Sequence, residues 1–274
     1  KTFTLNMTVT PVSNDPPVFN STDSHCTLED TPVTLGLDAP AIKDATDQSA
    51  GVGDNPERLG VITLTLTGAG AAANSPILTN NGATLTKADN TALVGNGSGG
   101  YTVVIVDASG TTTPSTTYHH AGVPSGAANI NYLTVAEYEA ITVSPALHRH
   151  ENFNVNVSVT EYEVDDSQVV VSTPDNGTNG NTAVQNILVS VEAVTDDAQL
   201  IFNTTAPLPT NVDAVTYGGA GGNTAATVTI KEDTNFNVKD ILIAQYADLD
   251  GTEVRSITIT NTTGQDIVVN GSTL

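Results

Sequence analysis

A short sequence that occurs twice divides the chain. Residues 12–22 read Val-Ser-Asn-Asp-Pro-Pro-Val-Phe-Asn-Ser-Thr, and residues 194–205 read Val-Thr-Asp-Asp-Ala-Gln-Leu-Ile-Phe-Asn-Thr-Thr. With one inserted residue, both copies run from an aliphatic residue through paired Asn or Asp residues to Phe-Asn-Ser/Thr-Thr. Each copy follows a stretch of alternating apolar and polar residues, which is typical of a strand. The repetition predicts two joints between stacked domains.

The two joints predict three parts. Residues 1–15 are expected to hold the last strand of a preceding module and its linker, residues 16–197 an elaborated module, and residues 198–274 the N-terminal part of a following module. The third part repeats the order of the second. A Glu-Asp-Thr turn occurs at 29–31 and 232–234, and an Asp-x-x-Glu loop occurs at 54–57 and 250–253, just before a Thr-rich strand. Repetition of this length is typical of tandem modules.

The composition favours β-structure. The chain of 274 residues is 38% hydrophobic, only 4% aromatic and free of Trp, and it is rich in Thr, Val, Asn and Gly. Alternating runs at 62–66, 101–106, 153–159 and 187–191 predict strands. Thr134 and Glu137 form a capping-box pattern that predicts a short helical turn. We therefore predict an all-β chain of tandem antiparallel β-sandwich modules.

The charge excludes several classes of partner. Thirty acidic residues against eight basic ones give a net charge of −22, so the chain is expected to repel nucleic acid and anionic membranes and to attract cations. Acidity alone also keeps an exported or halotolerant protein soluble. The single cysteine, Cys26, cannot form an internal disulfide and is expected to be a small buried hydrophobe. The sequence contains no run of 18 apolar residues and no signal-peptide pattern, so no membrane insertion is predicted for it.

The acidic residues gather in loops. In a β-sandwich the strands run alternately up and down, so counting strands predicts at which end of the module each loop lies. At the joint end we expect the first linker, the loop 38–57 and the turn at 165–166. At the far end we expect the turn at 29–30, the residues before the strand at 153 and the second linker. The third part has an acidic loop of its own. The candidate ligands are Asn14, Asp15, Glu29, Asp30, Asp44, Asp47, Asp54, Glu57, Glu151, Asp165, Asp166, Asp196, Asp197, Asp248, Asp250 and Glu253.

Calcium is the expected cofactor of these clusters. Carboxylates packed together without cations raise one another's pKa and destabilise the fold. Ca²⁺ accepts about six to eight oxygen ligands with tolerant geometry, whereas Mg²⁺ requires a stricter octahedron and zinc prefers Cys or His. The acidic residues are enough for several structural ions, roughly three to five. Ions that bridge a linker to the loops on both sides would stiffen the joint. The alternative is that the acidic loops are simply solvated.

These motifs resemble the tandem extender repeats of giant bacterial RTX adhesins and related cadherin-like or Ig-like calcium-binding surface repeats. The resemblance lies in residues 12–17 and 194–198, in the two Glu-Asp-Thr turns and in Asp-Leu-Asp-Gly-Thr-Glu at 248–253, and it covers most of residues 9–67 and 133–274. Two stretches depart from the pattern. The loop 38–57 is longer and less regular than 248–253, and Gly-Ser-Gly-Gly at 97–100 lacks the aspartates of the RTX calcium nonapeptide, so no β-roll is implied.

The resemblance implies Ig-like or cadherin-like β-sandwich modules that calcium rigidifies, exported by type I secretion and held at the bacterial cell surface. The implied role is an extracellular extender that projects binding domains in cell adhesion or biofilm formation. Its implied partners are the neighbouring modules of the same chain, with a host or surface glycan or peptide as a further candidate.

A catalytic constellation is missing from the sequence. We find no nucleophile elbow, phosphate loop or dinucleotide fingerprint, and no Trp on which a sugar could stack. His148 and His150 would share one face of a strand, but no third zinc ligand accompanies them. We therefore predict no enzyme activity and no catalytic residues.

The main alternative is a calcium-dependent ligand-binding module for a sugar or a peptide. The insertion at about 68–130 would supply the site, with Tyr101, Tyr118, His119 and His120 as its distinctive side chains. Long loops on a rigid scaffold often carry binding sites. The insertion could instead only add strands to the sandwich, which is the interpretation we favour.

Overall fold

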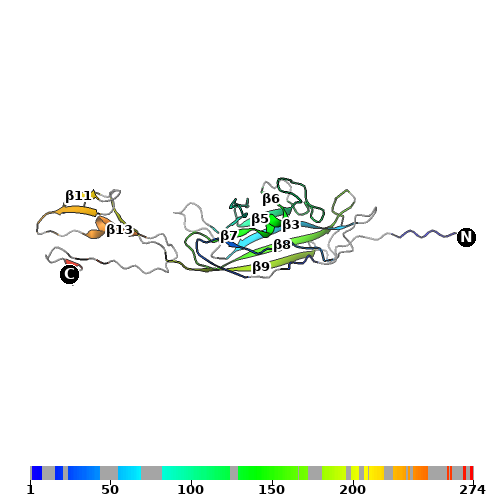
Figure 1. Ribbon diagram of the computed structural model, residues 1–274, viewed down its shortest axis with the longest axis horizontal. Coiled ribbons are helices and arrows are strands. Elements are labelled where there is room, and N and C mark those ends of the chain that lie inside the picture. The colour runs from blue at the N-terminus through cyan, green and yellow to red at the C-terminus, as the bar shows by residue number, and fades with distance from the viewer. Residues whose placement is uncertain are drawn as a thin grey trace. The chain divides into compact units, whose positions relative to one another are not determined.

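The computed structural model describes residues 2–7, 16–20, 24–43, 55–68, 82–123, 129–165, 167–171, 181–195, 199–203, 207–208, 210–218, 225–232, 234, 237–245, 258, 260, 268–269 and 272–273. The chain divides into two compact units, Lys1–Val194 and Thr195–Leu274. The described residues are mostly strands with very little helix, which confirms the all-β prediction (Figure 1). No helix within the described ranges is long and apolar enough to cross a bilayer.

The first unit contains a six-stranded sheet in the order β1-β9-β8-β3-β5-β6, and Figure 1 shows β9, β8 and β3 side by side. The runs predicted at 62–66, 153–159 and 187–191 fall in β3, β8 and β9, and the run at 101–106 falls in β5 except for Val106, so these strand predictions are confirmed. The strands are β1 (His25–Leu28), β3 (Glu57–Thr67), β5 (Gly100–Ile105), β6 (Ile130–Leu133), β8 (Phe153–Glu163) and β9 (Asn181–Glu192).

This sheet is mixed, whereas an antiparallel one was expected. The pairs β1–β9 and β5–β6 are parallel, and the pairs β3–β5, β3–β8 and β8–β9 are antiparallel. Parallel neighbours need a long crossover connection. The 24 residues from 106 to 129 provide one between β5 and β6, and the whole body of the unit lies between β1 and β9.

A second sheet of the first unit has the order β2-β7-β4. Its strands are β2 (Val33–Thr34), β7 (Thr142–Ser144) and β4 (Thr84–Thr86). The helix α1 (Val135–Glu139) precedes β7 and has the predicted capping box. Thr134 Oγ1 accepts from the Glu137 N–H at 3.2 Å, and the Thr134 N–H donates to Glu137 Oε2 at 2.8 Å. Within the described residues, the insertion 68–130 supplies β4 to one sheet and β5 to the other.

The two sheets share one hydrophobic core. Along β8, Phe153, Val155, Val157 and Val159 are buried while the residues between them are not, as the period of a strand requires. The smaller sheet contributes buried apolar side chains such as Leu85 to the same cluster.

Cys26 is exposed, so the expectation of a buried cysteine is wrong. It lies on β1, which is at the edge of the six-stranded sheet. Successive residues of a strand point to opposite faces, and on β1 the buried position belongs to Thr27.

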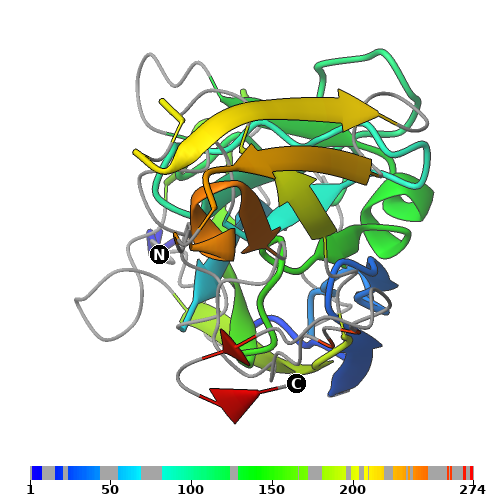
Figure 2. The same cartoon turned by 90° about the vertical axis from the view of Figure 1, so that its left-hand side faces the viewer.

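The second unit contains three two-stranded sheets among its described residues. In Figure 2, β11 in yellow lies beside β12 in orange, antiparallel to it. The acidic loop predicted at 248–253 and most of the strand predicted at 256–260 lie outside the described residues. The pairs are β10 (Gln199–Phe202) with β13 (Leu242–Gln245), β11 (Val212–Gly218) with β12 (Ala225–Ile230), and β14 (Val268–Val269) with β15 (Ser272–Thr273).

Candidate metal-binding carboxylates

Five of the sixteen predicted ligands lie in the described residues. They are Glu29, Asp30, Glu57, Glu151 and Asp165. The other predicted ligands lie outside those residues: Asn14, Asp15, Asp44, Asp47, Asp54, Asp166, Asp196, Asp197, Asp248, Asp250 and Glu253.

At one end of the first unit, three glutamates are buried on the core-facing side of two paired strands. Glu57, the first residue of β3, is directly opposite Glu163, the last residue of β8, and Leu59 is opposite Glu161. The exposed fractions of Glu57, Glu161 and Glu163 are 0%, 1% and 4%. Like charges directly opposite on one face of an antiparallel pair destabilise it. Charged carboxylates in this arrangement are stable only where partner groups, protons or a cation balance them.

The neighbouring arginine belongs to the other face of β3. Arg58 follows Glu57 directly, and adjacent residues of a strand point to opposite faces. Its Nη1 donates to the backbone oxygen of Glu57 at 2.8 Å, and burial lowers the pKa of its guanidinium. Arg58 therefore contacts the main chain at Glu57.

Asp165 lies at the same end as Glu57, as strand counting predicted. The Val164 N–H donates to the Pro56 oxygen at 3.1 Å, which ties the end of β8 to the start of β3. Asp165 Oδ1 accepts from the N–H groups of Ser167 and Val169 at 2.8 and 2.9 Å, so this oxygen stabilises the turn that follows β8.

At the opposite end, the turn at 29–30 is tied to the residues that precede the second joint. The Glu29 N–H donates to the Glu192 oxygen at 2.9 Å, and Glu29 Oε1 accepts from the Val194 N–H. Asp30 has a left-handed backbone with φ of 58°. Its Oδ1 accepts from the His148 N–H at 2.8 Å, and its Oδ2 lies 3.2 Å from His148 Nδ1. The carboxylate of Glu29 thus contacts Val194, the first residue of the second joint. The predicted meeting with Asp196 and Asp197 lies outside the described residues.

Glu151 is engaged by a neighbour. Arg149 Nε donates to Glu151 Oε2 at 2.7 Å, and its Nη2 also contacts Oε1. The hydrogen bond from Arg149 is the largest cause that lowers the pKa of the Glu151 carboxyl. A calcium ion at Glu151 would have to replace the guanidinium.

Glu161 and Glu163 were missed by the sequence reasoning, which ended the strand at Val159. The signal in the sequence is the spacing of two residues. Positions 161 and 163 continue the alternation that begins at Phe153, and the structure places both glutamates on the core side.

The candidate ligands supply oxygen atoms only, and calcium prefers oxygen ligands. Within the described ranges, no group of three or more His, Cys, Asp or Glu side chains is arranged so that it could hold a metal ion. A complete site at Glu57, Glu161 and Glu163 would therefore need ligands from the predicted residues outside those ranges. Counting strands predicts that Asn14, Asp15 and the loop 44–54 lie at this end of the unit. His148, considered for zinc, is paired with Asp30.

The distinctive side chains of the insertion are largely structural. Tyr101 and Tyr118 are buried in the core, and Tyr118 Oη donates to the Pro40 oxygen at 2.9 Å. Burial lowers the pKa of His119, and the ring of His120 packs edge-on against a tyrosine. These contacts hold the insertion against the sheets.

No protein-family model, curated protein or solved structure matches this chain. Its function is therefore inferred from its own residues.

Proposed function

We propose that this chain is a non-catalytic extender region of a bacterial cell-surface adhesin, built from tandem Ig-like or cadherin-like β-sandwich modules that calcium stiffens. The observation that supports this most is the burial of Glu57, Glu161 and Glu163 on facing strands at one end of the first unit. Burying a charge is strongly unfavourable unless the charge is paired or coordinates a metal.

Calcium suits this arrangement better than an internal counter-charge does. The chain has only eight basic residues against thirty acidic ones, so arginine and lysine cannot neutralise its carboxylates in general. Glu57, Glu161 and Glu163 would hold an ion together with linker residues such as Asn14 and Asp15. Several structural ions of this kind, at both ends of the module, would supply positive charge without a catalytic role.

The opposite end of the first unit also brings an acidic side chain to a joint. Glu29 accepts from the Val194 N–H, and the boundary between the two compact units follows directly at residue 195. Asp196 and Asp197 come next in the sequence. An ion held by Glu29, Asp30 and these aspartates would connect a module to the linker that leaves it, and the linker would then resist bending.

In this function the chain works as a spacer outside the cell. Type I secretion would deliver it, its neighbouring modules would be its main partners, and the stiff array would project binding domains in cell adhesion or biofilm formation. Extracellular calcium modules bind with dissociation constants of about 10⁻⁴–10⁻³ M, so occupancy would follow the surrounding medium.

The test is a comparison of the protein in EDTA and in millimolar calcium. We expect calorimetry to show a higher melting temperature in calcium, and solution scattering to show a longer, less variable particle. Asp15→Ala and Asp197→Ala test the two joints separately, and each should lower the calcium response at its own joint. A melting temperature and a scattering length that are the same in both media would contradict the proposal.

The alternative is a calcium-dependent sugar- or peptide-binding module that uses the insertion 68–130. It has less support, because β5 and the two buried tyrosines of the insertion pack in the hydrophobic core. A glycan and peptide array probed with and without calcium separates the two. A calcium-dependent hit that is lost when residues 110–128 are deleted would favour the alternative.

A further inference from the structure

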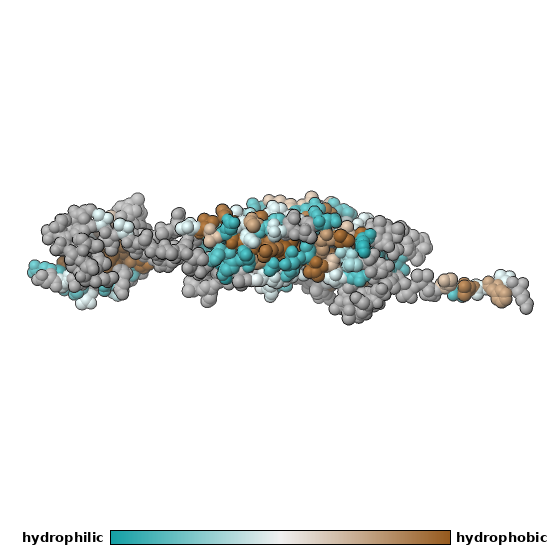
Figure 3. Space-filling model, turned by 90° about the horizontal axis from the view of Figure 1, so that it is seen from below, coloured by the Kyte–Doolittle hydropathy of each residue, from teal (hydrophilic) through white to brown (hydrophobic). Residues whose placement is uncertain are grey.

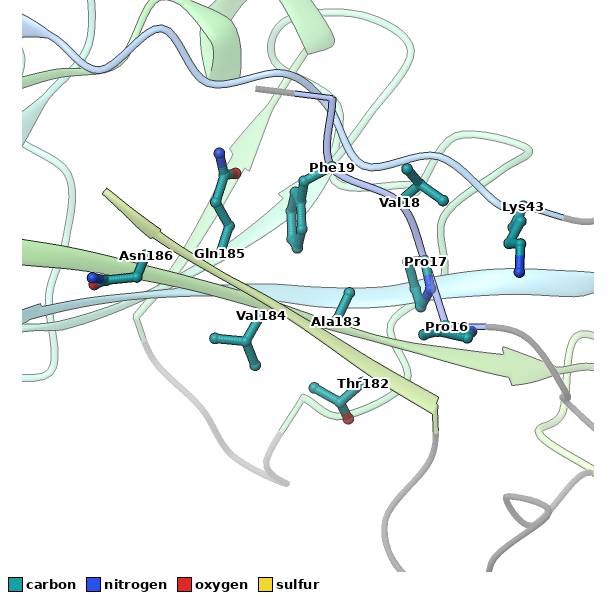
Figure 4. A pocket seen from close by; sticks show the side chains of 10 residues that line it. All are labelled: Pro16, Pro17, Val18, Phe19, Lys43, Thr182, Ala183, Val184, Gln185 and Asn186. Atoms are coloured by element: carbon teal, nitrogen blue, oxygen red, sulfur yellow. The ribbon is translucent and has the colours of Figure 1, made fainter. Parts of the chain in front are cut away.

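Hydrophilic and hydrophobic residues are intermixed on the surface of the first unit, as Figure 3 shows for one face. Two hollows in this surface differ in chemistry. The larger, of about 620 Å³, lies between residues 16–19 and residues 182–186 of β9, and apolar side chains such as Phe19 and Val184 line much of it (Figure 4). The smaller has a volume of about 180 Å³ and a lining rich in hydroxyl groups. Polar groups specify the chemistry of a ligand more closely than apolar contacts do.

The smaller hollow, the hydroxyl pocket, lies on the outer face of the six-stranded sheet, where β3, β8 and the insertion meet. β3 contributes Thr63, β8 contributes Ser158, Thr160 and Tyr162, and the insertion contributes Gly122. The three residues of β8 alternate with buried residues that face the core, so their side chains point outward. Thr63 is directly opposite Ser158 in the β3–β8 ladder. Four hydroxyl side chains are therefore gathered on one patch of the sheet.

A bulge in β3 shapes one side of the hydroxyl pocket. Between two regular pairs of the β3–β8 ladder, β3 has one residue more than β8, so Gly60 and Val61 stand opposite Thr160. The Val61 N–H donates to the Ala121 oxygen at 3.0 Å, and this hydrogen bond holds the insertion at the pocket. Bulges are frequent beside active sites, because they redirect the side chains around them.

Two glycines leave the space that Tyr162 occupies. A Cβ on Gly60 would lie 2.7 Å from Cε2 of the Tyr162 ring and 2.8 Å from the Ala121 oxygen, so a larger residue there would displace the ring or the insertion. Gly122 has a left-handed backbone with φ of 83°, and a Cβ there would lie 3.5 Å from Tyr162 Oη. The Tyr162 ring therefore packs on Gly60, and its hydroxyl lies beside Gly122. A tyrosine held in this way offers a ligand an apolar ring and a polar tip.

Three of the four hydroxyl groups are available to a ligand. Thr160 Oγ1 is hydrogen-bonded to Thr182 Oγ1 at 2.8 Å. Among the described residues, none forms a hydrogen bond with the side-chain hydroxyls of Thr63, Ser158 and Tyr162. Each of these hydroxyls can donate one hydrogen bond and accept two.

The charge and the size of the pocket restrict the ligand. None of the described residues that line it is Asp, Glu, Lys, Arg or His, although the chain has thirty acidic residues. A charged ligand would therefore lose water in the pocket without gaining a counter-charge. Hydroxyl groups that both donate and accept match a ligand that carries hydroxyl groups of its own. The 180 Å³ correspond to about six water molecules of about 30 Å³ each, which is room for one sugar ring.

We propose that the hydroxyl pocket binds one neutral sugar unit, such as the terminal residue of a glycan. Thr63 and Ser158 exchange hydrogen bonds with its hydroxyl groups, the Tyr162 ring contacts its C–H groups, and the Tyr162 hydroxyl adds a further hydrogen bond. Because no described residue of the lining carries a carboxylate, binding needs no calcium and does not rest on the proposed extender function. The site also differs from the calcium-dependent one considered for the insertion, which involves other side chains.

The first experiment is saturation-transfer NMR of the full chain with glucose, galactose, mannose and N-acetylglucosamine, each in EDTA and in millimolar calcium. We expect at least one of these sugars to bind saturably and equally in both media. The dissociation constant should be on the order of millimolar, because only a few neutral hydrogen bonds form. The proposal is overturned if none of the four sugars binds saturably, or if binding requires calcium.

The second experiment locates the binding with variants whose fold is checked by circular dichroism. Thr63→Val and Tyr162→Phe each remove one pocket hydroxyl and keep the shape of the side chain. Each should weaken binding about three- to tenfold, the effect of one lost hydrogen bond. Thr65→Val is the matched control, because it makes the same change on the same face of β3 but outside the lining of the pocket, and it should bind as the unmodified chain does. Equal binding by Thr63→Val and Thr65→Val, or by Tyr162→Phe and the unmodified chain, would show that the sugar does not occupy this pocket.

Discussion

Glu57 and Glu163 lie directly opposite each other on β3 and β8, and both side chains are buried. Two charged carboxylates in this relationship repel each other strongly, because their repulsion is little screened away from water. This relationship predicts that the effect of removing one charge depends on calcium.

Glu163→Gln is expected to have opposite effects in EDTA and in calcium. In EDTA it removes a like-charge repulsion of about 1 kcal/mol and should raise the melting temperature by about 2–4 °C. In millimolar calcium it removes a ligand charge and should lower the melting temperature relative to the unmodified protein. Calorimetry in both media measures this.

Glu192→Gln is the matched control for that experiment, because Glu192 is exposed at the other end of the same sheet. Its effect should be small and equal in the two media. A decrease for Glu163→Gln of the same size in EDTA and in calcium would mean that the glutamate is purely structural.

The Glu151–Arg149 pair predicts a pH dependence. Arg149 lowers the pKa of the Glu151 carboxyl in the folded protein. A group with a depressed folded pKa contributes stability that is present above its unfolded pKa and is lost as the pH falls through the folded value. Unfolding experiments below about pH 4.5 should therefore show an acid-side loss of stability that is smaller in Glu151→Gln. Carboxyl NMR should place the midpoint of Glu151 below its ordinary value, and a midpoint at or above that value would contradict the prediction.

Glu29→Ala should loosen the second joint. The Glu29 side chain is buried and its carboxylate accepts from the Val194 N–H, and a typical hydrogen bond contributes about 0.5–1.5 kcal/mol. We expect faster limited proteolysis near residues 194–198 in calcium and in EDTA alike. Glu192→Ala provides the control, and equal cleavage rates for the two variants would rule out a role of Glu29 at the joint.

The capping box gives a prediction that involves no metal. Thr134→Ala removes the acceptor for the Glu137 N–H and should destabilise the first unit by about 1 kcal/mol. The main-chain hydrogen bond from Thr134 is the largest cause that lowers the pKa of Glu137. Thr134→Ser keeps the cap and should be near neutral in chemical denaturation. A larger loss for Thr134→Ser than for Thr134→Ala would show that packing, not the hydroxyl, matters there.

Sequence patterns predicted the elements that depend on interactions between residues close together in the chain. The run at 153–159 forms most of β8 because alternate side chains of a strand face one core, and Thr134 caps α1 because the cap involves only residues within one turn. The parallel pairs β1–β9 and β5–β6 join residues far apart in the sequence, and no local pattern specifies them.

The same distinction applies to the candidate site. Glu57 was predicted from the density of acids in its loop, but its partner Glu163 depends on the register between β3 and β8. Glu161 and Glu163 also occupy positions where an apolar residue is the usual choice, so an alternation rule based on hydrophobicity ends too early. A buried charged residue at the end of a strand indicates that a requirement other than core packing determines the residue at that position.

The parallel pair β1–β9 has a mechanical consequence. β1 lies near the start of the first unit and β9 at its end, and they are paired over four positions, His25–Leu28 with Val189–Glu192. Tension applied between the two ends of the unit pulls these strands past each other along their length. All the hydrogen bonds of the pair then bear the load together in shear and do not open one after another, so the first unit is built to hold its length when it is pulled.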